Sequence, residues 1–270
     1  MRRLILPLLA LAALFFTACS DMPTPETSAR ELRGDTLVVG MDADYPPMTF
    51  KNPHGDVQGI EVDFARALGR ELGRPVRIEI LPWLQLKDAL DNHIVDIVMS
   101  GVSITKERER MFLFSKPYMQ VAQMAIMREG APLPDPKTKG KGLRIGFQRY
   151  TTGEQLVKEA FPEAVPVPAA TMREGMIRQM DGETDYFFTD APAVWYYTST
   201  NTLKGLVGWY VPYTVEYLAW PMPKGSEKLK KEVDAVIEKW RRNGFVTKTM
   251  NRWMPVRVVT PQRNELIRFD

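Results

Sequence analysis

Cysteine is almost absent from this chain of 270 residues: Cys19 is its one cysteine, and His54 and His93 are its two histidines. A single thiol forms no internal disulfide, so stability must come from buried apolar side chains. The histidines lie in polar surroundings without the spacing of metal ligands, and no cysteine pair accompanies them. The sequence therefore predicts no metal site and no cofactor. Internal repeats are also missing, which excludes a solenoid.

The apolar run at the start of the chain is too short to span a membrane. It covers 13 residues, Leu4 to Phe16, follows Arg2 and Arg3, and leads to small residues before Cys19. A membrane-spanning helix needs about 20 apolar residues. The pattern is instead typical of a signal peptide, residues 1–18, and we expect export to the periplasm or cell envelope.

Cys19 directly follows Phe16-Thr17-Ala18 and resembles the lipobox cysteine of bacterial lipoproteins, whose thiol is acylated. Phe16 departs from the leucine usual at its position. The alternative is ordinary secretory cleavage near Ala18, which leaves Cys19 as a free thiol. The next residues are rich in Pro, Thr, Ser and charge and poor in apolar side chains. We therefore expect a lipid-anchored tether over residues 19–34.

A strong excess of charge of either sign is missing. The chain has 36 Lys and Arg against 33 Asp and Glu, a formal charge of +3, and removal of residues 1–18 takes away two arginines and no acid. The remaining +1 gives no indication of nucleic acid as a partner. About 250 mature residues with 44% hydrophobic content suit one large or two medium domains.

Strand and helix patterns alternate along the mature chain. Apolar, β-branched runs predict strands at 36–41, 77–81, 94–99, 123–127, 143–147, 165–167 and 186–189. Amphipathic spacing predicts helices at 60–72, 85–92, 153–161, 172–180, 226–243 and 245–253. The pattern restarts after Tyr118, so the fold class is α/β with two units, each a mostly parallel sheet covered by helices.

Residues 59–72 look like the signature segment of the bacterial extracellular solute-binding proteins of family 3, the amino-acid receptors of ABC importers. Six further segments resemble the same family in the same order: 39–47, 82–83, 100–108, 114–118, 151–154 and 189–190. The resemblance covers residues 36–254. It implies a two-lobed, type II periplasmic-binding-protein-like fold with a hinge and a ligand cleft between the lobes. Lobe 1 would comprise residues 35–118 and 217–270 and lobe 2 residues 119–216, with crossovers near 119–121 and 213–217.

Two charged residues match family positions that grip a free amino acid. The resemblance implies that Arg108 binds the ligand carboxylate and that Asp190 accepts from its ammonium group, a pairing that suits both groups chemically. Arg108 also lies in a charged run, which is ordinarily solvated. Asp190 precedes Ala191-Pro192, so helix capping is an alternative role.

Eight other residues complete the predicted site. Ser100, Gly101 and Ser103 would offer polar partners, although such residues also form turns. Thr151 and Thr152 begin a helix whose N–H groups face the ligand carboxylate. Asp42, Tyr45 and Trp83 would surround the ligand side chain, which we expect to be polar or cationic; for the two aromatic residues, lobe packing is the alternative.

Arg149-Tyr150 stands where the family usually has a glycine before the two threonines, and Tyr150 could narrow the pocket or add a stacking face. Glu154 has capping-box spacing from Thr151. Glu154 is also the one candidate acid for a rival function, because the family resembles the cyclohexadienyl dehydratases.

The expected function is that of a monomeric receptor, not an enzyme, that closes on an amino acid and presents it to the permease of an ABC importer. Similar lobes also occur in sensor kinases and lytic transglycosylases. These contain a further domain, for which the 17 residues after Trp253 are too few. An alternative function is that of a signalling receptor whose closed state is recognised by a partner protein.

Overall fold

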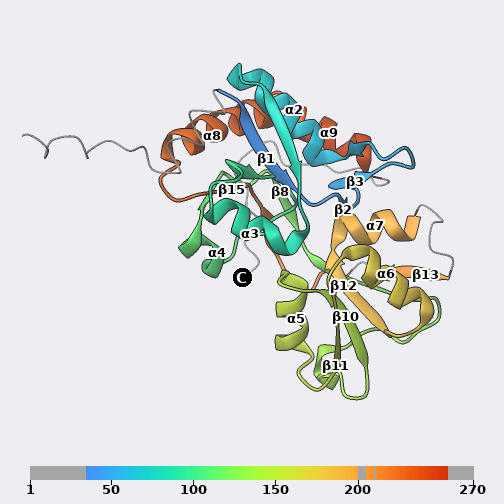
Figure 1. The fold of residues 1–270 in the computed structure, drawn as a ribbon. Helices are drawn as coiled ribbons and strands as arrows, with labels where there is room; N and C mark the ends of the chain where they lie inside the picture. Colours follow the sequence, from blue (N-terminus) through green and yellow to red (C-terminus); the bar gives the residue numbers. More distant parts are fainter. Residues whose placement is uncertain (1–34, 200–204, 210, 255–270) are drawn as a thin grey trace, which may run out of the picture. The chain divides into compact units, whose positions relative to one another are not determined.

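The computed structural model describes residues 35–199, 205–209 and 211–254. The predicted signal peptide, Cys19 and the tether lie outside these residues. No helix in the described part of the chain is long and apolar enough to cross a bilayer. The described residues from Thr36 onward belong to one unit, which contains two α/β lobes (Figure 1). The α/β class and the two-lobed architecture are thus as predicted.

Lobe 1 is built on a parallel sheet of order β5-β1-β6. Every residue of its central strand β1 is buried, because helices cover both of its faces. The strands are β1 (Leu37–Met41), β5 (Val76–Ile80) and β6 (Ile97–Val98), and the helices that follow the first two are α2 (Ile60–Leu72) and α3 (Trp83–Asp91).

The C-terminal helices return to lobe 1 and pack against α2 (Figure 1). They are α8 (Glu227–Arg242) and α9 (Phe245–Trp253), and both were predicted within one residue of their bounds. Phe64 of α2 stacks on Trp240 of α8 with ring centroids 5.7 Å apart, and it meets Trp220 at 5.9 Å. These aromatic side chains form the centre of the lobe 1 core.

Lobe 2 contains a five-stranded sheet of order β11-β10-β12-β9-β13. Strands β11, β10 and β12 run parallel to one another. Strand β9 runs antiparallel to β12, and β13 runs antiparallel to β9, so β13 points in the same direction as the first three strands and β9 is the reversed strand of this mixed sheet. Its elements are β9 (Gln123–Arg128), β10 (Arg144–Gln148), β11 (Val165–Ala169), β12 (Tyr186–Asp190), β13 (Leu206–Trp209), α5 (Thr152–Ala160), α6 (Met172–Asp181) and α7 (Ala191–Ser199).

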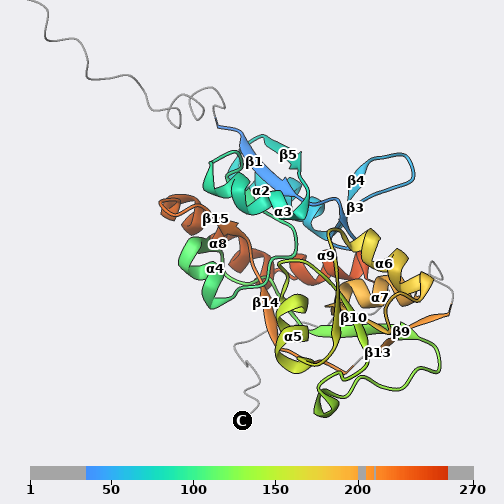
Figure 2. The same cartoon turned by 60° about the horizontal axis from the view of Figure 1, so that its bottom comes forward.

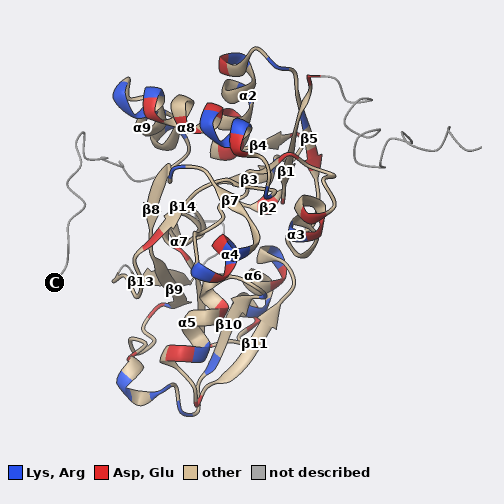
Figure 3. Ribbon diagram, turned by 90° about the vertical axis from the view of Figure 1, so that its left-hand side faces the viewer, with Lys and Arg blue, Asp and Glu red and all other residues tan. Residues whose placement is uncertain are grey.

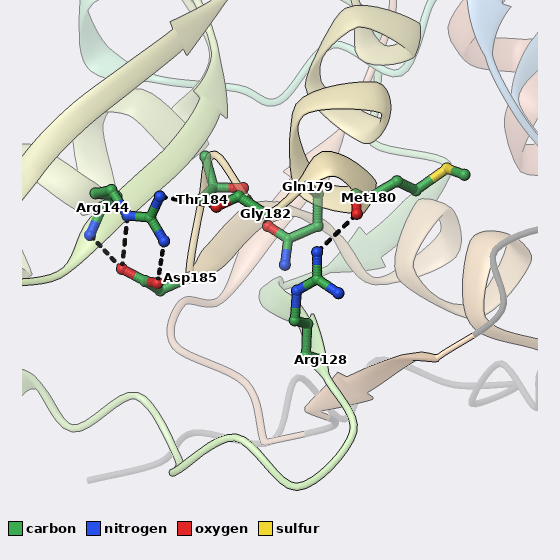
Figure 4. A network of polar contacts seen from close by, with 7 residues as sticks. All are labelled: Arg128, Arg144, Gln179, Met180, Gly182, Thr184 and Asp185. Carbon is green, nitrogen blue, oxygen red and sulfur yellow. Dashed lines mark hydrogen bonds and ion pairs between the residues drawn. The ribbon is translucent and has the colours of Figure 1, made fainter.

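The end of this sheet far from lobe 1 is held by polar contacts (Figure 4). Arg144 forms a bidentate pair with Asp185, with nitrogen to oxygen distances of 2.7 and 3.4 Å, and also donates to the Gly182 carbonyl. Arg128 donates to the Met180 carbonyl at 2.6 Å. These bonds fix the turn between α6 and β12. Strand β12 in turn ends at Asp190.

Two strands run between the lobes and pair with each other antiparallel; Figure 2 labels the second of them, β14. They are β8 (Met119–Val121) and β14 (Glu216–Leu218), and Glu216 lies opposite Val121. Both overlap the ranges predicted for the crossovers, while the lobe boundaries themselves stay predictions. After β14, strand β15 (Pro221–Met222) pairs with β7 (Leu113–Phe114) in lobe 1.

Several elements were not predicted, among them α7 and β13 of lobe 2 and some short ones. A small sheet of β2 (Asp44–Tyr45), β3 (Thr49–Lys51) and β4 (Val57–Gln58) follows β1, and strands of two or three residues carry too little periodicity to detect. Helix α4 (Lys106–Met111) contains alternating charges rather than an apolar face (Figure 3). Its signal is the capping residue Thr105, whose side chain accepts from the Arg108 N–H at 3.2 Å.

Candidate functional site

A small cavity lies between the two lobes and is lined by residues of both. All ten residues of the predicted site line it: Asp42, Tyr45, Trp83, Ser100, Gly101, Ser103, Arg108, Thr151, Thr152 and Asp190. They come from the carboxyl ends of strands and from the first turns of helices, where open α/β sheets bind ligands.

Three residues that line the cavity were not predicted from the sequence: Gln123, Gln148 and Thr189. Gln148 ends β10 and Thr189 lies near the end of β12, so the rule on strand ends could have found both. Gln123 is different because it begins the antiparallel strand β9. It reaches the cavity only because it lies opposite Asp190 in the sheet, and no local pattern predicts that pairing.

Arg108 is held at the cavity by backbone carbonyls of both lobes. Its Nη1 donates to the Ser103 carbonyl and its Nη2 to the Tyr150 carbonyl, both at 2.9 Å. The guanidinium carbon lies 5.6 Å from the centroid of the Trp83 ring. Burial lowers the pKa of Arg108, against the opposing effect of Asp190 and Glu216, but a guanidinium keeps its charge throughout the physiological range. The alternative of a solvated charged run therefore holds for the exposed neighbours of Arg108 on α4 but not for Arg108 itself.

Asp190 is buried and receives two side-chain donors. Tyr45 of lobe 1 donates from its hydroxyl, and Gln123 donates from its amide nitrogen. Burial, helped by the charge of Glu216, raises the pKa of Asp190 to about 7, although the two donors and Arg108 act to lower it. The hydrogen bonds of this carboxylate therefore run into the cleft rather than to the first turn of α7.

The turn after β6 is supported from beneath by a buried acid, Glu61. The Gly101 N–H donates to Glu61 Oε1 at 3.0 Å, Trp220 Nε1 donates to Oε2 at 2.8 Å, and the Tyr118 hydroxyl also donates to this carboxylate. Burial raises the pKa of Glu61 to about 7. Gly101 has φ 63°, and a Cβ there would lie 2.7 Å from the Tyr45 ring, so this position requires glycine.

Asp42 is a second acid of the cavity and follows β1. Its N–H donates to Ser100 Oγ at 3.1 Å, and its Oδ1 accepts from the Asp44 N–H at 3.1 Å. Burial, and then the charge of Asp44, raise the pKa of Asp42 to about 6. The cavity therefore contains two carboxyl groups and one guanidinium.

The first turn of α5 has capping contacts on one side and cavity contacts on the other. Thr151 Oγ1 accepts from the Glu154 N–H at 3.4 Å, and Thr152 Oγ1 accepts from Gln123 Nε2 at 3.0 Å. Glu154 accepts from the Tyr150 N–H at 2.5 Å and pairs with Lys158 at 2.7 Å. These are the contacts of a capping residue, and Glu154 is not among the residues that line the cavity.

The expectation that Tyr150 narrows the pocket is wrong. Its side chain is 74% exposed and it is not one of the cavity residues. Its backbone has φ 60°, a left-handed conformation that glycine adopts without strain. The role of this position is therefore to turn the chain so that its carbonyl meets Arg108.

Several contacts join the lobes around the cavity in a closed arrangement. Tyr45 meets Asp190 and Arg108 meets the Tyr150 carbonyl, as described, and Trp83 Nε1 donates to the Arg149 carbonyl at 3.0 Å. On the far side, the N–H of Arg173 donates to Asp44 Oδ2 at 2.9 Å. Closure thus brings residues of both lobes into one site.

Two α/β lobes, two connecting strands and a charged cavity between them define the class of two-lobed binding proteins. Residues 37–256 match the bacterial extracellular solute-binding proteins, family 3, and the chain belongs to that family. Family membership indicates a place of action outside the cytoplasm.

Three similar proteins illustrate the family. A probable histidine-binding protein of Neisseria gonorrhoeae is 27% identical over 247 residues, which cover 90% of this chain and 92% of that protein. The crystal structure of AncCDT-1, an ancestral amino acid-binding protein and precursor of cyclohexadienyl dehydratase, has 31% identity and a TM-score of 0.77 and covers 83% and 97%. ArtJ of Geobacillus stearothermophilus, which binds arginine, lysine and histidine, has 27% identity and a TM-score of 0.76 and covers 83% and 96%.

Proposed function

We propose that this protein is the receptor of an ABC importer and that its ligand is a cationic amino acid. The observation that carries the proposal is the charge of the cavity. Arg108 is complementary to an α-carboxylate, Asp190 to an α-ammonium group, and Asp42 remains as a second acid for a positive side chain. A neutral amino acid would leave the Asp42 charge without a partner.

The aromatic residues fit the same ligand class. Trp83 and Tyr45 line the cavity beside Asp42, and aromatic faces attract a guanidinium, an ammonium or an imidazolium group. Two of the similar proteins described above bind arginine, lysine or histidine, which supports a cationic ligand. The amide of Gln148 adds a neutral acceptor on the opposite lobe.

The proposed mechanism is ligand docking on lobe 1 through Arg108, followed by closure of lobe 2, which brings Asp190 to the ammonium group. The permease then recognises the closed form. Closure is favoured by ligand because the complete set of partners exists only when the lobes meet.

Isothermal titration calorimetry of the purified protein with L-arginine, L-lysine, L-histidine, L-glutamine and L-glutamate tests the proposal. We expect the three cationic amino acids to include the tightest ligand and L-glutamate to be the weakest. Tighter binding of L-glutamate, or no binding of any amino acid, would reject the cationic ligand class.

We also propose that Cys19 is acylated and that residues 19–34 tether a monomeric receptor to the membrane. The apolar run and the cysteine that follows it support this proposal. Mass spectrometry of the protein from its native membrane tests it: the mature protein should begin at a diacylated Cys19, and Cys19→Ser should release the receptor into the soluble fraction. A mature chain that begins after Ala18 with a free thiol would contradict the lipid anchor.

Glu154 was the candidate general acid for the alternative function of a dehydratase, and its capping contacts do not support that role. Incubation with prephenate and with arogenate still separates the two functions. The receptor proposal predicts no phenylpyruvate and no phenylalanine, and turnover of either substrate would overturn it.

A further inference from the structure

Glu216 is a buried acid of the connecting strand β14 that the proposed mechanism does not yet use. Its side chain is 9% exposed. Ser103 Oγ donates to its Oε2 at 2.6 Å, and Thr214 Oγ1 donates to its Oε1 at 2.7 Å. One of these donors belongs to the lobe 1 part of the site, whereas the other precedes β14 in the chain.

The contacts continue from both donors to the two charged residues of the cavity. On the lobe 1 side, the Ser103 carbonyl accepts from Arg108 at 2.9 Å. On the other side, Thr214 Oγ1 accepts from the Gln123 N–H at 2.9 Å, and the Gln123 amide donates to Asp190. A continuous series of hydrogen bonds thus runs from Arg108 through the hinge to Asp190, with Glu216 at its centre.

The charge of Glu216 acts on the same two residues. It raises the pKa of Arg108 and, after burial, is the largest influence that raises the pKa of Asp190. The other groups that face Asp190 are the Tyr45 hydroxyl, the Gln123 amide and Arg108, and all three lower its pKa. The Tyr45 hydroxyl also experiences the Glu216 charge.

We propose that Glu216 is the positioning residue of the hinge: by joining Ser103 to Thr214, its carboxylate sets the relative placement of Arg108 and Asp190 when the lobes close. Hinge closure is governed by a few residues that absorb the backbone change. β14 is one of only two strands that run between the lobes in the described chain, so a carboxylate fixed at both oxygens restricts the closed geometry. The inference rests on the proposed function only in the choice of ligand for one measurement.

A purely structural role would also explain a buried acid with two donors. The two roles differ in what they predict for the affinity of the site and for closure. If Glu216 only filled space in the hinge, its replacement would change stability and leave both unchanged, whereas loss of its charge lowers the Asp190 pKa in either case.

Three variants separate these roles. Glu216→Gln removes the charge, Thr214→Val breaks the series of hydrogen bonds and keeps the charge, and Glu107→Gln is the matched control. Glu107 is an exposed acid that also acts on Arg108 electrostatically but takes no part in the series. For each variant, carbon-13 NMR of the Asp190 carboxyl in the protein without added amino acid gives its titration. Calorimetry with L-arginine and L-lysine gives affinity, and small-angle X-ray scattering gives closure.

We expect Glu216→Gln to lower the Asp190 pKa by about one unit and to weaken binding roughly tenfold or more, with a smaller closed fraction. Thr214→Val should weaken binding to a similar degree at an unchanged Asp190 titration. Glu107→Gln should change neither. If Glu216→Gln leaves affinity and closure unchanged, as is expected of Glu107→Gln, the proposal is overturned. If Glu216→Gln does not fold, Thr214→Val decides: unchanged affinity and closure reject the positioning role.

The two proposals fail in different ways. If neither L-arginine nor L-lysine binds the unaltered protein, the cationic ligand class is wrong. The scattering of the protein alone still tests the positioning role of Glu216, because it is measured without amino acid.

Discussion

The two lobes hold their charged cavity residues by different means. In lobe 1, Arg108 is fixed by two backbone carbonyls, those of Ser103 and Tyr150. In lobe 2, Asp190 is fixed by two side chains, those of Tyr45 and Gln123. The arginine keeps its charge at every physiological pH, whereas burial places the Asp190 pKa near 7.

This difference divides the work of the site. The lobe 1 half presents a constant charge whose position depends on the backbone. The lobe 2 half presents a charge whose strength depends on neighbouring side chains and on pH. Mutations of the residues around Asp190 are therefore expected to change ligand affinity in graded steps. Mutations around Arg108 are expected either to leave binding intact or to abolish it.

Removal of either charged residue should give the largest effect. Truncation of one partner in a buried charged contact costs about 2–5 kcal/mol, so Arg108→Ala and Asp190→Ala should each weaken binding roughly 30- to 5,000-fold in calorimetry. Arg108→Lys keeps the positive charge but lacks the planar guanidinium, so its affinity should lie between those of the unaltered protein and Arg108→Ala. If Arg108→Ala bound with the affinity of the unaltered protein, Arg108 would not contribute to binding and the comparison of the two lobes would not hold.

The pH dependence of binding should come from lobe 2. An ammonium ligand needs the ionised carboxylate, and Asp190 is protonated below its pKa of about 7. Affinity should therefore fall by about tenfold per pH unit as the pH drops below 7, more steeply below the Asp42 pKa of about 6. Titrations from pH 5.5 to 8 measure this slope. In Asp190→Asn the decline between pH 7 and 6 should disappear, and its persistence there would place the titrating group elsewhere.

Glu61 offers a contrast, because it has a similar pKa but no contact with the cavity. Folded Glu61 keeps its proton to about pH 7, while an unfolded glutamate loses it near its ordinary value of 4.5. Unfolding thus releases a proton in this window, and the free energy of unfolding should fall as pH rises, by at most about 1.4 kcal/mol per pH unit. Urea unfolding should show a flatter profile for Glu61→Gln. Equal slopes in both proteins would contradict the assignment.

The smallest effect is expected at Tyr150, whose carbonyl serves lobe 1 while its ring faces solvent. Tyr150→Gly should leave affinity within twofold and change stability by about 1 kcal/mol or less, since relief of the left-handed backbone is offset by the entropy of glycine. Trp83→Ala, which removes a ring that lines the cavity, should weaken binding and serves as the positive control. A larger effect of Tyr150→Gly would show that its ring reaches the ligand.

Most main elements of both lobes followed from local sequence, but α7 and β13 of lobe 2 were not among the predicted helices and strands. The spacing of Ile60, Phe64 and Leu68 predicted α2, and the apolar run 36–41 predicted β1. Both signals are strong because each element buries one face or a whole strand. β2 and α4 escaped because the first has two residues and the second has no apolar face.

For the site, the ten residues that line the cavity were predicted from the sequence, through the resemblance of their segments to the family and the rule that ligands gather where strands end and helices begin. Tertiary structure decided what these residues do together. It brought Gln123 beside Asp190 through antiparallel pairing, turned the Tyr150 ring away and its carbonyl toward Arg108, and placed Glu216 between the halves. Sheet pairing and the hinge join residues far apart in the chain, and no local pattern contains those contacts.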